Sequence, residues 1–209
     1  MSPEHPAWDR QLEGVVVSGP DADVWRELCA GEESGLTAIY QRHVDAVYNF
    51  AFRRTASWSM AEDAVQATFT TLWRLARERK LTPLRLPTAR PLLLTMTSHE
   101  CANLRRSQRR RAALLRRLRP TPDVVDHAPG VAERLDDERR MSEVRRAMGH
   151  LPRSQQDAIE LVVWAGLSVA EAASVVGVAE GTVKSRLFRG RQRLAVLLGV
   201  DVAEEEITS

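Results

Sequence analysis

The chain has 209 residues, of which 44% are hydrophobic and only 5% are aromatic. That supply suits two small helical domains better than one large sandwich or barrel. No apolar stretch is long enough to cross a bilayer, and the opening residues, MSPEHPAWDR, lack the basic start and apolar run of a signal peptide. We therefore expect a cytoplasmic protein that does not insert into a membrane.

The two cysteines, Cys29 and Cys101, stand far apart and outside any CxxC pair. They are too few for a disulfide scaffold, and no cluster of further ligands accompanies them. We therefore expect neither a metal nor a cofactor.

The formal net charge is only +2, but the charges are segregated along the chain. Arginines crowd between Asn103 and Arg119 with no acid among them, and a second basic run spans Lys184 to Arg193. Acids gather between Asp123 and Glu143 and again after residue 200. Clustered arginines bind phosphates and release counterions, so this pattern favours a polyanionic partner.

Prolines and glycines over residues 1–30 predict an irregular extension. Apolar residues then recur at three- and four-residue steps, which predicts a helix with one apolar face. That face carries Leu36, Tyr40, Val44, Val47, Phe50 and Ala51.

A second amphipathic helix is predicted from about Ser59, because its apolar and polar residues separate cleanly onto two faces. The apolar face carries Ala61, Val65, Phe69, Leu72 and Ala76. The polar face carries Ser59, Asp63, Gln66, Thr70 and Arg74.

Prolines 83, 87 and 91 then interrupt the helical pattern, before the segment 92–96 opens a helix that runs into the arginine-rich stretch. Proline, glycine and acids after that stretch predict a flexible linker. The predicted architecture is all-α, with two small helical domains joined by the linker, the second of them a helix-turn-helix domain. Its parts are an irregular extension (1–30), a first domain (31–119), the linker (120–138), the second domain (139–200) and an acidic tail (201–209).

The most specific signal lies between Ser154 and Leu198. Ser168 and Glu171 match a capping box, which predicts a short helix that ends at a turn formed by Gly177. Another helix is predicted to begin near Gly181. Helix, tight turn and helix form the helix-turn-helix arrangement, in which the second helix enters the DNA major groove. The helix before this motif is predicted over about 154–164, with Ile159, Val162 and Val163 facing inward.

The last helix has two chemically distinct faces. Its inward face is predicted to carry Val183, Leu187, Gly190 and Leu194. Its outward face and flanks carry the candidate DNA-binding residues Thr182, Lys184, Ser185, Arg186, Phe188, Arg189 and Arg193. Basic side chains can donate to guanine or phosphate, and a phenylalanine can touch a thymine methyl group. A phenylalanine beside an arginine on a polar face therefore favours a groove-binding helix over a merely solvated one.

Residues 181–187 have the sequence GTVKSRL, and residues 61–69 have the sequence AEDAVQATF. With residues 40–51 and Leu151-Pro152, these blocks resemble the extracytoplasmic-function (ECF) class of bacterial sigma factors. The resemblance covers about residues 34–198, and the two blocks occur in the family's order around an acidic, proline-containing linker.

The resemblance implies that core RNA polymerase and promoter DNA are the partners. The polar face formed by Asp63, Gln66 and Thr70 would dock on the clamp helices of the polymerase. The loop from about Thr82 to Thr88 and the helix after it would hold the minus-ten element as it melts, which requires capture of flipped bases in a positive groove. The residues implied for this role are His99, Asn103, Arg105, Arg106 and Arg109, and the last helix would bind the minus-thirty-five element. Members of the class are often held inactive by an anti-sigma factor, which is a further implied partner.

Two other functions compete with this interpretation. A stand-alone helix-turn-helix regulator would explain residues 142–198 but leaves the helix that carries Asp63 and Gln66 without a role. An enzyme acting on nucleic acid would need paired acid–base or metal residues, and adjacent residues such as His99 and Glu100 point to different helix faces. No Gly-rich phosphate loop, HExxH motif or nucleophile elbow is present, so we expect no enzymatic activity.

Overall fold

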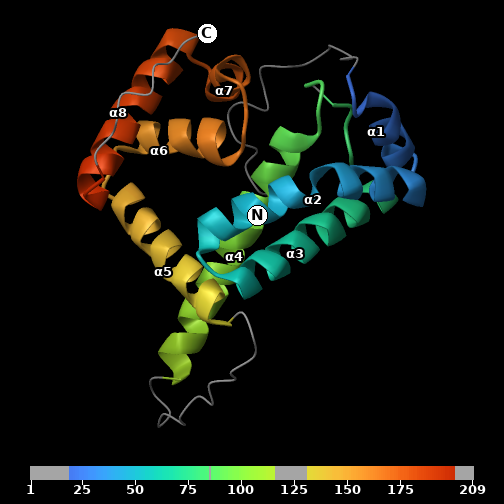
Figure 1. The fold of residues 1–209 in the computed structure, drawn as a ribbon. Coiled ribbons are helices and arrows are strands. Elements are labelled where there is room, and N and C mark those ends of the chain that lie inside the picture. The colour runs from blue at the N-terminus through green and yellow to red at the C-terminus, as the bar shows by residue number, and fades with distance from the viewer. Residues whose placement is uncertain (1–18, 85, 116–130, 201–209) are drawn as a thin grey trace. The chain divides into compact units, whose positions relative to one another are not determined.

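The computed structural model describes residues 19–84, 86–115 and 131–200 of the chain (Figure 1). Every regular element within those ranges is a helix, which confirms the predicted all-α class. Contacts divide the chain into two compact units, one that ends at Met141 and one that begins at Ser142.

The first unit consists of helices, of which the first four pack around one core. They are α1 (Ala22–Cys29), α2 (Glu33–Thr55), α3 (Trp58–Arg77), α4 (Arg90–Leu115) and the first part of α5 (Val131–Met148). Helices α2, α3 and α4 pack against one another, and α1 lies on α2 (Figure 1). The most deeply buried apolar side chains are Trp25, Leu28, Ile39, Val47, Leu72 and Leu93.

The faces of α3 are those that the sequence predicts. All five residues of the predicted apolar face are buried, and all five residues of the predicted polar face are exposed. A regular repeat of apolar residues at three- and four-residue steps is therefore enough to orient this helix.

The predicted apolar face of α2 is only partly right. Val47, Phe50 and Ala51 are buried, but Tyr40 is 44% exposed. Ile39 fills the core in its place. The reason is that α2 contacts α1, α3 and α4, so its buried stripe shifts around the helix along its length.

Two of the predicted irregular segments contain helix. Residues 22–29 were expected to be part of an irregular extension, but they form α1, which is held by the buried side chains of Trp25 and Leu28. The sequence predicts residues 131–138 as part of the linker, but they form the start of α5, where two glutamates, an arginine and an alanine favour a helix. The remaining residues of the predicted extension up to 18, the predicted linker from 120 to 130 and the predicted tail lie outside the described residues.

The second unit contains the rest of α5, then α6 (Arg153–Ile159), which continues into a π-helical turn, η2 (Glu160–Trp164), followed by α7 (Val169–Val176) and α8 (Glu180–Leu198). Met148, Leu151 and Ile159 form its apolar cluster. The prediction that Val163 faces inward is wrong, because its side chain is 43% exposed. The π-helical turn inserts an extra residue into the helical repeat and rotates the residues that follow.

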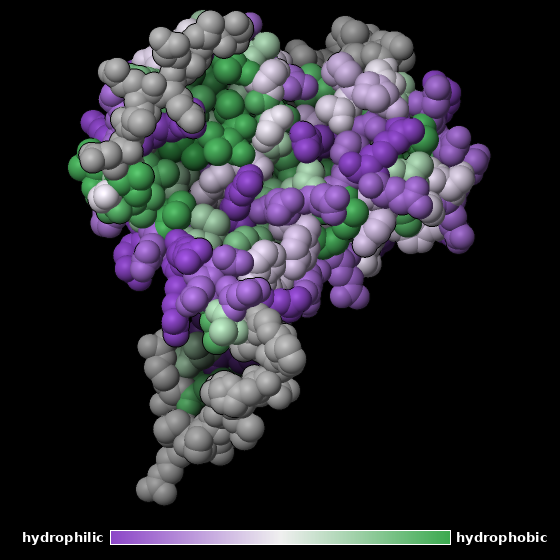
Figure 2. All heavy atoms as spheres, in the orientation of Figure 1, coloured by the Kyte–Doolittle hydropathy of each residue, from purple (hydrophilic) through white to green (hydrophobic). Residues whose placement is uncertain are grey.

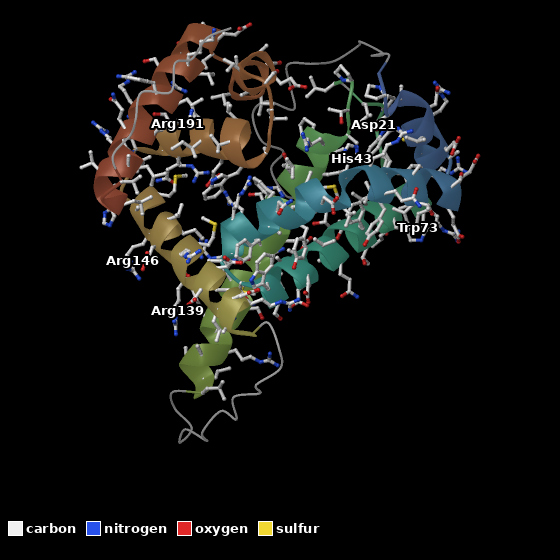
Figure 3. The ribbon with its side chains drawn as sticks, viewed as in Figure 1. Asp21, His43, Trp73, Arg139, Arg146 and Arg191 are labelled. Carbon is white, nitrogen blue, oxygen red and sulfur yellow. The ribbon has the colours of Figure 1, made fainter. Side chains whose placement is uncertain are left out.

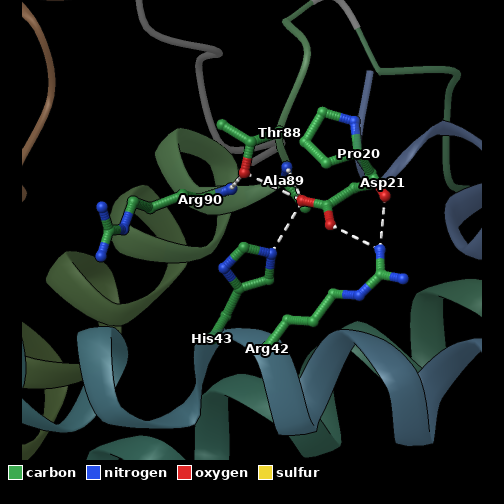
Figure 4. Close-up of polar contacts among 7 residues, drawn as sticks. All are labelled: Pro20, Asp21, Arg42, His43, Thr88, Ala89 and Arg90. Atoms are coloured by element: carbon green, nitrogen blue, oxygen red, sulfur yellow. Dashed lines mark hydrogen bonds and ion pairs between the residues drawn. The ribbon is translucent and has the colours of Figure 1, made fainter. Parts of the chain in front are cut away.

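A buried carboxylate connects three segments of the first unit (Figure 4). Asp21, just before α1, is only 2% exposed. Its oxygens accept hydrogen bonds from the amide of Ala89 at 2.8 Å, the hydroxyl of Thr88 at 2.9 Å and the guanidinium of Arg42 at 3.0 Å. The fourth donor is Nε2 of the buried His43, at 2.7 Å; because an ionised carboxylate can only accept, this nitrogen carries the proton.

Opposing effects act on the pKa of Asp21. Burial by itself raises the pKa, but the hydrogen bonds from Ala89, Thr88, Arg42 and His43 together outweigh it, so the pKa lies below its ordinary value of 3.8. The charged form is therefore favoured in the folded protein. Its contribution to stability is present above pH 3.8 and is lost as the pH falls through the lowered pKa.

We expect Asp21→Asn to lower the free energy of unfolding near neutral pH. We also expect this free energy to decrease less than in the unaltered chain as the pH is lowered. The reason is that the amide cannot accept the same four hydrogen bonds and does not titrate. Urea unfolding from about pH 7 to about pH 3 measures both effects. Asp23→Asn is the matched control, because Asp23 lies on the surface of the same segment with its side chain 86% exposed. An acid dependence in Asp21→Asn equal to that of the unaltered chain would contradict the assignment.

Candidate functional site

A helix-turn-helix is present where the sequence predicts it. The hydroxyl of Ser168 accepts from the amide of Glu171 at 3.1 Å, and the Glu171 carboxylate accepts from the amide of Ser168 at 2.8 Å. These reciprocal bonds confirm the predicted capping box. Gly177 ends α7 in the left-handed region, with φ of 71°, and so supplies the turn.

One face of α8 is occupied by packing within the second unit. Val183 is 2% exposed, and Leu187 and Leu194 pack on the apolar cluster of this unit. Gly190 lies so close to α6 that a Cβ atom there would meet Cδ1 of Ile159 at 3.0 Å. The close approach of α6 fixes which side of α8 faces outward, and the four residues predicted to face inward do so.

The opposite face of α8 carries exposed donors and an aromatic ring. Lys184, Ser185, Arg189 and Arg193 are exposed, and the Phe188 ring is 52% exposed. Thr182 and Arg186 are half-buried at the flanks. In the view of Figure 2, hydrophobic side chains gather on the surface of this unit.

Two of the candidate DNA-binding side chains are already linked. The guanidinium of Arg189 donates to the hydroxyl of Ser185 at 2.7 Å and to its carbonyl at 3.2 Å. Arg193 instead donates to the side chain of Gln155 on α6, at 3.4 Å. The Arg189–Ser185 pair is therefore held on the outward face, whereas Arg193 is partly engaged within the unit.

A second candidate surface lies on α4. His99, Asn103 and Arg106 follow one another at steps of four and three residues and are all exposed, so they share one face. Asn103 accepts from Arg106 at 2.6 Å and donates to Glu100 at 3.4 Å. The structure thus joins two of the predicted minus-ten residues in one polar row.

The other two predicted residues of α4, Arg105 and Arg109, lie on a neighbouring face. Arg105 is half-buried, and Arg109 is exposed. Burial lowers the pKa of Arg105, and the positive charges of Arg109 and Arg54 lower it further. A guanidinium stays charged in proteins, so this concentration of positive charge favours the binding of an anion.

The third candidate surface is an apolar groove between α2 and α3, with a volume of about 570 Å³. Its lining includes Leu36, Tyr40, Val44, Tyr48, Val65, Phe69 and Trp73. The rings of Tyr40 and Phe69 meet edge to face, with centroids 4.8 Å apart. Trp73, labelled in Figure 3, contributes from α3.

The predicted partner-binding residues lie at this groove or near it. Gln66 and Thr70 are exposed and form part of its lining, while Asp63 is exposed on α3 outside the lining. Sequence reasoning missed the groove because it placed Tyr40 in the core. The aromatic Trp73, which belongs to neither predicted face of α3, was the signal that could have revealed it.

Within the described ranges, no group of three or more His, Cys, Asp or Glu side chains is arranged to hold a metal ion. None of the helices there is both long enough and apolar enough to span a membrane.

Comparison with known proteins connects these surfaces to one family. The model for Sigma-70 region 2 matches residues 39–111, and the model for Sigma-70 region 4 matches residues 141–194. The chain is 32% identical to the ECF RNA polymerase sigma factor SigM of Mycobacterium tuberculosis over 181 residues, which cover 86% of this chain and 85% of SigM. It is 28% identical over 172 residues to the ECF RNA polymerase sigma factor SigL of the same species, which covers 81% of this chain and 92% of SigL.

A solved structure also shares the fold. The structure of CnrH in complex with the cytosolic domain of CnrY matches with a TM-score of 0.58 and 23% identity, covering 86% of this chain and 97% of that chain. At this level of identity the match shows the arrangement of helices and nothing more specific.

Proposed function

The chain belongs to the extracytoplasmic-function (ECF) family of RNA polymerase sigma factors, and we propose that its two helical units divide promoter recognition between them. As a sigma factor it binds RNA polymerase, directs the enzyme to specific promoters and initiates transcription there. In our proposal α8 binds the minus-thirty-five element. Helix α4 and the loop before it hold the minus-ten strand, and the α2–α3 groove with its polar rim docks on the polymerase.

The observation that carries the proposal for α8 is the contrast between its two faces. One face is buried against α6 through Val183 and Gly190. The other presents Ser185, Phe188 and Arg189 to solvent, next to Lys184. Phosphate contacts from the basic side chains would position the helix, and the Arg189–Ser185 pair would contact base edges in the major groove.

The charge and the row of polar side chains on α4 support its role at the minus-ten element. A single strand without its complement exposes bases that stack on guanidinium planes and phosphates that need cations. Arg106, which donates a hydrogen bond to Asn103, offers a guanidinium plane on which a base can stack. The concentrated positive charge of Arg105 and Arg109 can bind the phosphates. His99 lies one helical turn before Asn103 on the same face.

The α2–α3 groove supports polymerase binding because it combines apolar walls with a polar rim. An amphipathic helix binds such a groove through apolar side chains spaced three and four residues apart. Tyr40, Phe69 and Trp73 would receive these side chains, and Gln66 and Thr70 would bond the polar flank of the partner. Asp63, beyond the lining, would contribute charge. The clamp helices of core RNA polymerase are the partner that we propose.

We further propose that the protein acts in the cytoplasm and performs no catalysis of its own. We also propose that an anti-sigma factor binds it. The complex of CnrH with the cytosolic domain of CnrY shows a protein of this fold bound to another polypeptide. A stand-alone regulator has no comparable use for the α2–α3 groove and is not favoured.

Arg189→Ala is expected to reduce transcription from promoters that depend on a minus-thirty-five element by about 5- to 150-fold, because one bidentate base contact contributes about 1–3 kcal/mol of discrimination. Run-off transcription with matched and substituted elements measures the loss. Arg191→Ala is the control, since Arg191, labelled in Figure 3, is exposed and lies two residues after Arg189, on another face of α8. Affinity for core polymerase should not change; loss of both activities together would count against this assignment.

Asp63→Ala combined with Gln66→Ala is expected to weaken binding to core polymerase without altering the thermal unfolding midpoint, because both side chains are exposed and neither supports the core. Titration of core polymerase with labelled protein measures the affinity. Asp45→Ala removes an exposed carboxylate from α2 that does not line the groove, and it should bind as well as the unaltered chain. Equal affinities for all three proteins would mean that the docking surface lies elsewhere.

A further inference from the structure

The segment from Gly19 to Trp25 contacts the loop between α3 and α4 at both of the loop's ends. At the end nearer α3, the indole N–H of Trp25 donates to the carbonyl of Thr82 at 2.9 Å. Trp25 is only 2% exposed, so the donor side of this bond lies in the core. The bond joins residues that are far apart in sequence and fixes where the loop leaves α3.

At the end nearer α4, the contacts are more extensive. Asp21 accepts from the hydroxyl of Thr88 and from the amide of Ala89. Gly19 lies directly on Pro87, where a Cβ atom on the glycine would come within 2.3 Å of the proline carbonyl oxygen. No other residue can occupy position 19 without displacing the loop, so the backbone of this segment and that of the loop are fitted to each other.

Helix α2 holds the other side of the same carboxylate. Arg42 bonds both the carboxylate of Asp21 and the carbonyl of Pro20, and His43 bonds the carboxylate from within the core. The segment is therefore fixed to α2 as well as to the loop. All of these contacts lie within the first unit.

We propose that the segment Gly19–Trp25 is a positioning element for the minus-ten strand, because it holds the two ends of the α3–α4 loop, at Thr82 and at Pro87–Ala89, where the loop receives the DNA. This inference rests on the proposed role of the loop and α4 at the minus-ten element. Asp21 and Trp25 touch no DNA in this account and act through the loop. The segment precedes the part of the chain that matches Sigma-70 region 2, which begins at residue 39.

The physical basis is the entropy of the loop. A loop that is free at its ends must be ordered when the strand binds, and that ordering weakens the complex. A loop whose two ends are already held loses less entropy on binding and rearranges less readily around ill-fitting bases. Releasing either end should therefore reduce discrimination between correct and incorrect minus-ten bases more than it reduces binding to polymerase.

The test uses holoenzyme assembled from core polymerase and the full chain, with fork-junction DNA from a promoter mapped by run-off transcription. Trp25→Phe removes the N–H donor and keeps a smaller aromatic ring in the core, and Asp21→Asn releases the other end of the loop. Asp23→Asn is the control on the same helix. We expect the ratio of affinities for the matched and the singly substituted minus-ten probe to fall by about three- to tenfold in Trp25→Phe and Asp21→Asn, the equivalent of one hydrogen bond, with core affinity unchanged.

A loop variant, Thr82→Gly with Pro83→Gly, separates failure of this inference from failure of the proposed function. If the loop variant alters minus-ten discrimination while folded Trp25→Phe does not, the positioning role is overturned and the role of the loop stands. If neither variant alters it, the loop does not recognise the minus-ten element, and both proposals fall. Asp21→Asn is interpreted only if its circular dichroism matches that of the unaltered chain; otherwise Trp25→Phe decides.

Discussion

The first unit depends on one buried charge. An ionised carboxylate removed from water costs several kcal/mol unless hydrogen bonds replace its hydration. Asp21 finds four donors, and they come from α2 and from the residues that lead into α4. The charge is stable only when these segments meet, so it specifies how α1, α2 and the α3–α4 loop fit together. The buried stripe of α2 shifts because α2 packs on α1, α3 and α4, and Tyr40 is left to line the groove.

In the second unit, a glycine contact, a capping box and a glycine turn fix how the helices pack. Gly190 allows α6 to lie against α8, and the capping box and Gly177 place α7 before it. Backbone and small side chains thus settle the packing, and the outward face of α8 stays free for arginine, lysine and an exposed phenylalanine. The two units present different surfaces, since one carries an apolar groove and an arginine-rich helix and the other carries a helix with an exposed basic face.

The sequence predicted those features whose causes are local. The helix-turn-helix followed from Ser168, Glu171 and Gly177, and the faces of α3 followed from a regular repeat. Features that depend on distant residues escaped prediction. Helix α1 is too short for a periodic signal and is stabilised by its contacts with the rest of the unit. The groove exists only because α2 and α3 lie side by side. The hydrogen-bond donors to Asp21 come from other segments of the chain. The π-helical turn at Glu160–Trp164 displaced Val163 from its predicted position for a similar reason, because nothing in its residue types marks the extra residue.

The most direct test of the whole account is run-off transcription with core RNA polymerase that lacks any sigma factor. The template is a library of genomic promoter fragments from the source organism, and each component alone is the control. The account predicts transcripts only when both proteins are present, with shared start sites preceded by two common sequence elements. Site-specific DNA binding by the isolated protein, with no transcript and no co-migration with core polymerase after any bound inhibitor has been removed, would contradict it.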